Sequence, residues 1–296
     1  MTRIERILAP NPSVYTLEGT NTWVVGDEPS IVIDPGPDDE EHLREVARFA
    51  GRVGAVLVTH DHPDHAPGAA TFARTVDAPV FAFRLKGAEH LADGRVIESG
   101  SVKLRTVHTP GHTSDHVSFW LEQDRSLFTG DTVLGRGTSF IDPPGGDLVK
   151  YMRSLKRILD LRPRTIYPGH GPVVLEAEPT VRDYLGHREE REREILDRLN
   201  DQPSTIDEVV AVIYANYPKD VHELAGKSVL AHLIKLEAEG TVDHTGKGKT
   251  ARYSVVEPRA CARCGKPVRG RGRYCSSCSL LLLQEGSEPA GEQAGP

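Results

Sequence analysis

The stretch VLVTHDHPDHAPGA (residues 56–69) contains three histidines and two aspartates within six consecutive positions, directly after an apolar run. These residues are His60, Asp61, His62, Asp64 and His65. Side chains of these types repel or compete with one another unless positive charge lies between them. Neutral imidazole and carboxylate groups are ligands of Zn²⁺, Fe²⁺ and Mn²⁺. The stretch therefore predicts a metal site, and we expect a pair of ions whose remaining ligands lie elsewhere in the chain.

Three later motifs supply those candidate ligands. Each motif lies at the end of a predicted strand and places one ligand-type side chain beside or close to a glycine. HTPGHT (108–113) presents His112, FTGDT (128–132) presents Asp131, and YPGHGP (167–172) presents His170.

Apolar periodicity in the first part of the chain predicts a layered α/β domain. A hairpin over 20–36 is followed by a helix over 39–49 and by a buried strand over 53–60, which delivers the histidine cluster at its end. Further elements are expected downstream: strands within 102–113, 117–132 and 164–174, and a helix over 148–159.

After this domain the sequence pattern changes from strands mixed with helices to consecutive helices. A charged helix is predicted over 182–200, and Thr205 and Glu208 have the spacing of a capping box that opens the next helix. A third helix ends at Gly240, and an alternating hairpin follows over 241–256. Three helices followed by a hairpin is the order of a winged-helix domain.

All four cysteines lie near the C-terminus, in CARCGKPVRGRGRYCSSC (261–278). Two C-x₂-C pairs, Cys261 with Cys264 and Cys275 with Cys278, predict a structural zinc ribbon, with disulfides as the alternative. Four thiolates leave no open coordination position, so this zinc is not expected to be catalytic. The predicted domains are thus 1–177 (the layered α/β domain with the candidate ligands), 178–256 (winged helix) and 257–283 (ribbon), with a disordered tail at 284–296.

Charge is distributed unevenly along the 296 residues. The whole chain carries a net charge of -7, whereas residues 246–278 contain nine Lys and Arg against Glu257 alone, a net of 9 − 1 = +8. This segment suits a polyanionic strand, or it is simply a solvated basic face. No apolar run is long enough for a transmembrane helix, and the cysteine pattern predicts a cytoplasmic protein without a membrane partner.

The motifs THDHPDH, HTPGHT, FTGDT and YPGHGP, in this order, resemble the metallo-β-lactamase superfamily. The resemblance implies an αββα sandwich with a binuclear metal site along one edge. It assigns His60, His62 and His112 to the first metal, Asp64, His65 and His170 to the second, and Asp131 to a bridging position. Asp61 is expected either to orient a ligand imidazole or to cap the turn. His116 is expected either to support a ligand or to fill a strand start.

A site of this kind predicts hydrolysis. Two divalent ions about 3.5–4 Å apart can share one water, and a metal lowers the pKa of such a water from 15.7 toward about 7. The resulting hydroxide attacks an electrophilic carbon or phosphorus, and Asp64 is positioned to accept its proton. The metal site alone leaves open whether an ester, a thioester or a phosphodiester is cleaved.

Flanking segments narrow the choice. NPSVYTLEGTNTWVVG (11–26), TPGHTSDHVSF (109–119) and the winged-helix segment resemble the β-lactamase-like protein 2 branch of the superfamily. That resemblance implies metal-dependent cleavage of single-stranded RNA. Fungal thioesterases that release polyketides from carrier protein resemble the same branch, so a thioesterase acting on a glutathione, coenzyme A or carrier-protein thioester is the alternative. A nucleic-acid-binding regulator is a third hypothesis, which the intact ligand set disfavours.

Overall fold

The computed structural model describes residues 1–257, 259–268, 277–279 and 281. The chain divides into two compact units, Met1–Arg191 and Glu192–Pro296. The division falls within the long helix α4 (Ala177–Asp201), and the domain boundaries drawn from the sequence stay a prediction.

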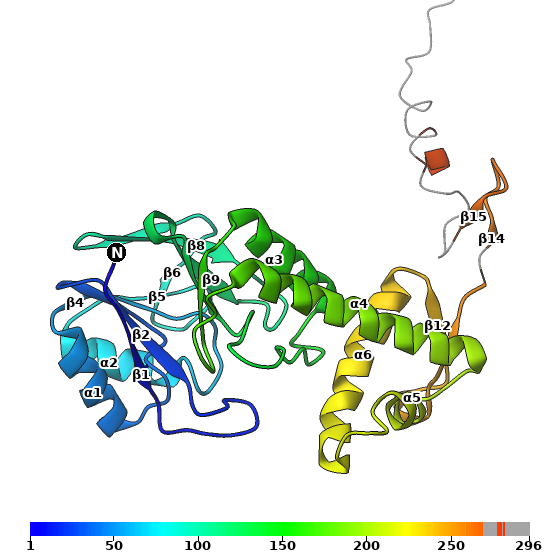
Figure 1. Cartoon of the computed structure of the whole chain (residues 1–296), viewed down its shortest axis with the longest axis horizontal. Coiled ribbons are helices and arrows are strands. Elements are labelled where there is room, and N and C mark those ends of the chain that lie inside the picture. Colours follow the sequence, from blue (N-terminus) through cyan, green and yellow to red (C-terminus); the bar gives the residue numbers. More distant parts are fainter. Residues whose placement is uncertain (258, 269–276, 280, 282–296) are drawn as a thin grey trace, which may run out of the picture. The chain divides into compact units, whose positions relative to one another are not determined.

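Two sheets form the centre of the first unit (Figure 1). The first sheet has the order β1-β2-β3-β4-β5-β6 and the second has the order β11-β10-β9-β8-β7. Strands of the first sheet are β1 (Ile4–Leu8), β2 (Asn21–Val25), β3 (Ser30–Ile33), β4 (Val53–Leu57), β5 (Val80–Ala82) and β6 (Glu89–His90). Strands of the second are β7 (Val96–Ser99), β8 (Val102–His108), β9 (Val117–Leu121), β10 (Ser126–Gly130) and β11 (Thr165–Pro168).

Alternation along the strands divides the apolar side chains between two cores. Trp23 and Ile31 point into the core between the two sheets, together with Leu104 and Phe119 of the second sheet. Their neighbours, such as Val24, join the core on the other face of the first sheet. This division follows from the period of two in a strand, which sends successive side chains to opposite faces.

Helices cover the outer faces of both sheets (Figure 1). Helices α1 (Glu40–Ala50) and α2 (Pro67–Val76) pack their apolar residues on the first sheet. On the second sheet, α3 (Leu148–Leu161) is fixed by Tyr151, whose hydroxyl donates to the Thr132 carbonyl oxygen at 2.7 Å. The order helix, sheet, sheet, helix is the predicted αββα sandwich.

The second unit has its own core, formed by the end of α4, α5 (Ile206–Ile213), α6 (His222–Ala238) and the hairpin of β12 (Val242–Thr245) and β13 (Arg252–Val255). The predicted capping box is confirmed, because the Thr205 side chain accepts from the Glu208 N–H and the Glu208 side chain accepts from the Thr205 N–H. Short 3₁₀ segments occur at Glu122–Asp124, Lys219–Val221 and Gly248–Thr250.

Part of the cysteine segment is also described. The strands β14 (Arg259–Ala260) and β15 (Pro267–Val268) pair antiparallel, and Gly265 occupies the turn between them with φ 72°. The sulfur atoms of Cys261, Cys264 and Cys278 lie within 4.8 Å of one another, which suits a shared metal ion. Cys275 and the predicted tail 284–296 lie outside the described residues.

Candidate metal centre

Strand direction brings the candidate ligands to one edge of the sandwich. In the second sheet β8, β10 and β11 run the same way, so the loops that follow them meet at one edge. Those loops carry His112, Asp131 and His170. In the first sheet the loop after β4 carries the histidine cluster, which ends where α2 begins. The four motifs of the sequence therefore converge in space.

The seven candidate side chains form two groups, and within each group the ligand atoms lie within 4.8 Å of one another. One group consists of His60, His62, His112 and Asp131, and the other of Asp64, His65 and His170.

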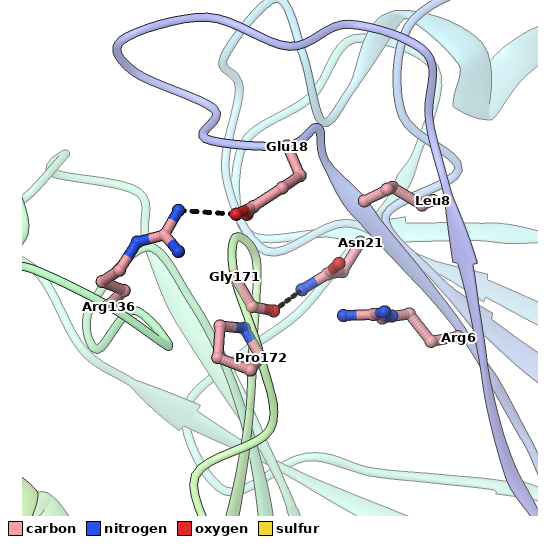
Figure 2. Close-up of a pocket in the computed structure, with 7 residues that line it drawn as sticks. All are labelled: Arg6, Leu8, Glu18, Asn21, Arg136, Gly171 and Pro172. Carbon is pink, nitrogen blue, oxygen red and sulfur yellow. Dashed lines mark hydrogen bonds and ion pairs between the residues drawn. The ribbon is translucent and has the colours of Figure 1, made fainter.

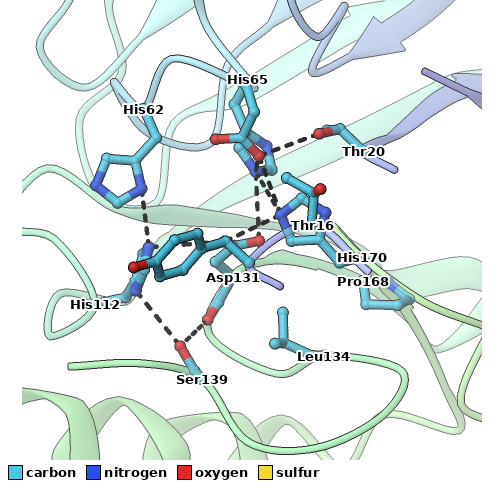
Figure 3. A network of polar contacts seen from close by, with 12 residues as sticks. Thr16, Thr20, His62, His65, His112, Asp131, Leu134, Ser139, Pro168 and His170 are labelled. Carbon is cyan, nitrogen blue, oxygen red and sulfur yellow. Dashed lines mark hydrogen bonds and ion pairs between the residues drawn. The ribbon is translucent and has the colours of Figure 1, made fainter. Parts of the chain in front are cut away.

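Nitrogen and oxygen atoms face one another at short range within and between these groups (Figure 3). His112 Nε2 lies 3.1 Å from His62 Nδ1, and His65 Nε2 lies 3.2 Å from His170 Nε2. Asp131 connects the groups: its carboxylate oxygens lie 3.3 Å from His170, 3.4 Å from His65 and 3.7 Å from His112.

The donor set fits metal ions. His60 Nε2 and Asp131 Oδ1 are both buried and have no hydrogen-bond partner among the described residues. A buried polar atom without a partner is costly, and an ion between these atoms would satisfy both. Imidazole nitrogens and carboxylate oxygens are also the donors that Zn²⁺, Fe²⁺ and Mn²⁺ accept.

Electrostatics lead to the same conclusion. Burial lowers the pKa of His60 well below its ordinary value, and the neighbouring imidazoles lower it further, so this ligand is held neutral. At His65 burial works to lower the pKa, but the Asp64 and Asp131 carboxylates outweigh it and raise the pKa well above the ordinary value. Burial works to raise the pKa of Asp131, yet His170 and His65 hold it well below its usual range. The carboxylates thus attract positive charge to the centre of the cluster.

Asp34, at the end of β3, supports two ligands and was missed in the sequence. Its buried carboxylate lies 2.9 Å from His65 Nδ1, and it accepts from both the N–H and the hydroxyl of Thr59, each at 2.7 Å. The Thr59 hydroxyl in turn contacts His60 Nδ1 at 3.0 Å. The segment IDPG (33–36) carries the signal that marks the other motifs, an acidic residue at a strand end close to a glycine.

Main-chain and hydroxyl groups orient other ligands. His112 Nδ1 lies 2.7 Å from the Phe140 carbonyl oxygen, and His170 Nδ1 lies 3.2 Å from the Gly19 carbonyl oxygen. Thr20 donates from its hydroxyl to Asp64 Oδ2 at 3.1 Å. Such contacts fix the ring orientation and leave Nε2 of both histidines as the nitrogen that would bind a metal.

His116 and Asp61 differ in their surroundings. His116 is fully buried, its ring stacks on His60 with centroids 4.9 Å apart, and its Nε2 accepts from the Asp131 N–H at 3.0 Å. It is therefore placed to support a ligand. Asp61 is exposed, and its own N–H donates to the Asp115 carboxylate at 3.0 Å, which fits a role in the turn.

Crowding explains why a glycine precedes His170. A Cβ atom at Gly169 would lie 2.5 Å from Asp131 Oδ1 and 2.8 Å from His65 Cε1. Any side chain at this position would displace two of the candidate ligands.

None of the helices in the described parts of the chain has the length and apolar character needed to cross a membrane.

Comparison with known proteins places this geometry in a family. Residues 15–170 match the model of the metallo-β-lactamase superfamily, and residues 205–250 match that of the β-lactamase associated winged helix domain. A β-lactamase-like protein 2 homolog of Drosophila melanogaster is 35% identical over 86% of this chain and 94% of its own length. An atrochrysone carboxyl ACP thioesterase of Aspergillus chevalieri is 32% identical over 87% of this chain and 88% of its own.

Solved structures show the same fold. A metallo-β-lactamase family protein of Thermus thermophilus superposes with a TM-score of 0.72 at 22% identity, covering 86% of this chain and 98% of that one. The fold class predicted from the motifs is thereby confirmed, and the family model and the relatives confirm the family resemblance. With a site of two convergent ligand groups, a matching family model and relatives aligned along most of their length, this chain belongs to the metallo-β-lactamase superfamily, as a hydrolase with an attached winged helix.

Proposed function

We propose that this hydrolase uses two metal ions to cleave phosphodiester bonds of single-stranded RNA. The observation that carries the proposal is the convergence of two ligand groups around one carboxylate, Asp131. His60, His62 and His112 would hold one ion, and Asp64, His65 and His170 the other. The donor types suit Zn²⁺ in both positions, with Fe²⁺ or Mn²⁺ as alternatives.

When bound, the two ions would supply an activated water nucleophile and neutralise the negative charge that develops on the attacked group. The residues of the chain would accept the proton of the water and position the candidate ligands. Asp64, held by the Thr20 hydroxyl, accepts the proton of the attacking water. His116 holds the main chain of Asp131 in place through the Asp131 N–H.

Two features support RNA as the substrate. The segment 246–278 carries a net charge of 9 − 1 = +8 in a chain of net charge -7, and positive charge concentrated in one segment suits a phosphate backbone. Winged-helix domains suit nucleic-acid binding, and one is matched here over residues 205–250. In this proposal Cys261, Cys264, Cys275 and Cys278 hold a structural zinc that stabilises the basic segment.

Thioester hydrolysis is the second candidate. A relative with 32% identity is named an acyl-carrier-protein thioesterase. Beside the metal centre, Val14 and Tyr15 are 80% and 57% exposed, and the Tyr15 ring lies 6.4 Å from that of Phe140, whose carbonyl oxygen contacts His112. An exposed apolar surface at this position suits an acyl group as well as a nucleobase.

One set of assays separates these possibilities. The purified full-length protein would be tested against labelled single-stranded RNA and a panel of coenzyme A, glutathione and carrier-protein thioesters. RNA cleavage supports the first proposal, and thioester turnover without RNA cleavage moves the assignment to the second. RNA binding without turnover of either substrate would instead favour the nucleic-acid-binding regulator.

Asp131→Ala provides the test of the binuclear mechanism. We expect loss of hydrolysis and of metal measured by elemental analysis, with an unchanged circular dichroism spectrum. Asp160→Ala, which removes an exposed carboxylate of the same unit, is the matched control and should retain both. Unchanged turnover in Asp131→Ala would refute a site built around this carboxylate. The cytoplasmic location stays a prediction from the cysteine pattern.

A further inference from the structure

A cavity of about 340 Å³ opens in the first unit beside the loop that carries His170 (Figure 2). Polar side chains from three separate segments line it: Arg6 of β1, Glu18 and Asn21 from the start of β2 and the loop before it, and Arg136 of the loop after β10. None of these residues belongs to the metal-binding motifs.

The cavity and the metal centre share two wall segments. Gly171 lines the cavity and directly follows His170, whose Nδ1 contacts the Gly19 carbonyl oxygen at 3.2 Å. Glu18 lines the cavity two residues before Thr20, which donates to Asp64. Two segments therefore contribute both to the cavity and to the metal centre, which places the cavity next to the candidate ligands.

Charge in the cavity favours an anion. Arg136 forms an ion pair with Glu18 at 2.6 Å, which neutralises both groups. The Arg6 guanidinium, in contrast to the Arg6 main chain within β1, makes no hydrogen bond or ion pair with any residue in the part of the chain that the structure describes. The cavity therefore carries a net charge of 2 − 1 = +1 from its two arginines and one glutamate, which matches the single negative charge of a phosphodiester.

A second observation, independent of charge, points to a ligand. The Asn21 side chain is fully buried, and its Nδ2 donates to the carbonyl oxygens of Pro168 and Gly171, both at 2.9 Å. Asn21 Oδ1, however, has no hydrogen-bond partner among the described residues. A buried acceptor of this kind requires a donor; the oxygens of a phosphodiester only accept, so a ribose 2′-hydroxyl of the strand or a water bound with the phosphate would supply it.

We infer that this cavity binds a phosphate group of the substrate strand next to the one cleaved, with Arg6 as its principal ligand. The inference rests on the proposed RNA hydrolysis. Phosphates recur at every nucleotide, so a strand with one phosphate at the metals necessarily presents another nearby. The planar guanidinium fork pairs with phosphate oxygens through two parallel hydrogen bonds. Glu18 opposes binding, because it neutralises Arg136.

The test uses the full-length protein and a labelled single-stranded RNA, with Arg6→Ala, Arg6→Lys and Glu18→Gln as variants. Arg44→Ala is the matched control, since Arg44 is an exposed arginine of the same unit that pairs with Glu40 at 2.7 Å, away from the cavity. RNA affinity is measured by fluorescence anisotropy over a range of salt concentrations. A chelator is present to remove the metal ions and so prevent cleavage of the RNA. Steady-state kinetics are measured separately on RNA and on bis(p-nitrophenyl) phosphate, a small diester with a single phosphate.

Arg6→Ala should weaken RNA binding and raise KM by about 10-fold, the usual effect of losing one charged hydrogen-bonded contact. The slope of log affinity against log salt should become shallower by about 0.7. Arg6→Lys should retain that slope, and Glu18→Gln should bind RNA more tightly with a slope steeper by about 0.7, because Arg136 is released. Turnover of the small diester should not change in any variant.

The outcomes separate this inference from the proposed function. If the wild-type protein cleaves RNA while Arg6→Ala and Glu18→Gln bind it unchanged, the cavity inference is wrong and the function stands. If the small diester and RNA are never cleaved but Arg6-dependent RNA binding is observed, the proposed reaction fails and the anion site stands. If coenzyme A binds in an Arg6-dependent way and RNA does not, the strand assignment is overturned.

Discussion

Replacing Asp34 by Asn should loosen metal binding without disturbing the fold. The Asp34 carboxylate receives three hydrogen-bonding groups, two from Thr59 and one from His65 Nδ1. Asn has nearly the same shape, and it tolerates the left-handed backbone that Asp34 adopts at φ 50°, so the substitution adds no backbone strain. What changes is the acceptor set: the amide has no charge and one oxygen in place of two, so an NH2 group faces either the Thr59 N–H or the pair formed by His65 Nδ1 and the Thr59 hydroxyl.

The magnitude follows from that lost contact. A hydrogen bond involving a charged group contributes about 1.5–3 kcal/mol, and His65 is then free to adopt the tautomer that protonates its metal-facing nitrogen. Loss of such a supporting partner typically lowers metal affinity or activity by about 10–100-fold. We therefore expect weaker binding of one metal ion, with the other ion affected less, in a competition titration against a chromophoric chelator.

Asp93→Asn is the matched control for this experiment. The Asp93 carboxylate also accepts from a main-chain N–H, that of His108 at 2.8 Å, and from a side chain, Arg157 at 2.9 Å, but it contacts none of the candidate ligands. It should lose some stability toward urea and retain wild-type metal affinity. Equal metal affinity in Asp34→Asn and the wild-type protein would show that Asp34 does not hold His65 for the metal.

Three further outcomes are expected. Replacing Cys261 and Cys264 by Ser should release one zinc per chain and make the chain sensitive to protease cleavage after about residue 256. The turnover of a small ester should not change, and loss of that turnover would show that the ribbon is not a separate module. Truncation after Val256 removes six Lys and Arg, so the slope of log RNA affinity against log salt should become shallower by up to about four, at roughly 0.7 per contact. An unchanged slope would show that the basic segment is a solvated face and does not contact RNA. Burial lowers the pKa of His42 below 6.5. The contribution of neutral His42 to stability is therefore complete above pH 6.5 and is lost as the pH falls toward the lowered pKa, and the free energy of unfolding then decreases by at most about 1.4 kcal/mol per pH unit. In His42→Gln the urea midpoint should fall less steeply over this pH range.

Local signals explain which elements the sequence predicts well. The predicted helix over 39–49 corresponds to α1, which Asp39 caps by accepting from the His42 N–H, and the predicted hairpin over 20–36 corresponds to the pair β2 and β3. The helix α2 was not predicted. Its first turn begins with Pro67 and Gly68, and its N-cap Ala66 makes no side-chain hydrogen bond. This helix forms because Phe72 and its neighbours are buried on the first sheet, which is information from tertiary packing.

The same distinction applies to the candidate site. The ligand motifs are visible because each combines a metal-binding side chain with a strand end and a glycine. Asp34 shares that pattern, but its partner His65 lies 31 residues away, and no local feature indicates their contact. Arg6, Glu18 and Arg136 belong to none of the ligand motifs, and only the fold brings them to one cavity.

Because the candidate ligands come from both sheets, occupancy of the centre and integrity of the sandwich are linked. His60 follows a strand of the first sheet, whereas Asp131 and His170 follow strands of the second. An ion held between them would be released when the sheets separate, so it would bind the folded state alone. At a free metal concentration a thousandfold above Kd, each such ion adds about 4.1 kcal/mol to the free energy of unfolding. The melting temperature of this protein should therefore rise in steps as its sites fill, and a thermal scan at graded metal concentrations would report how many ions it holds.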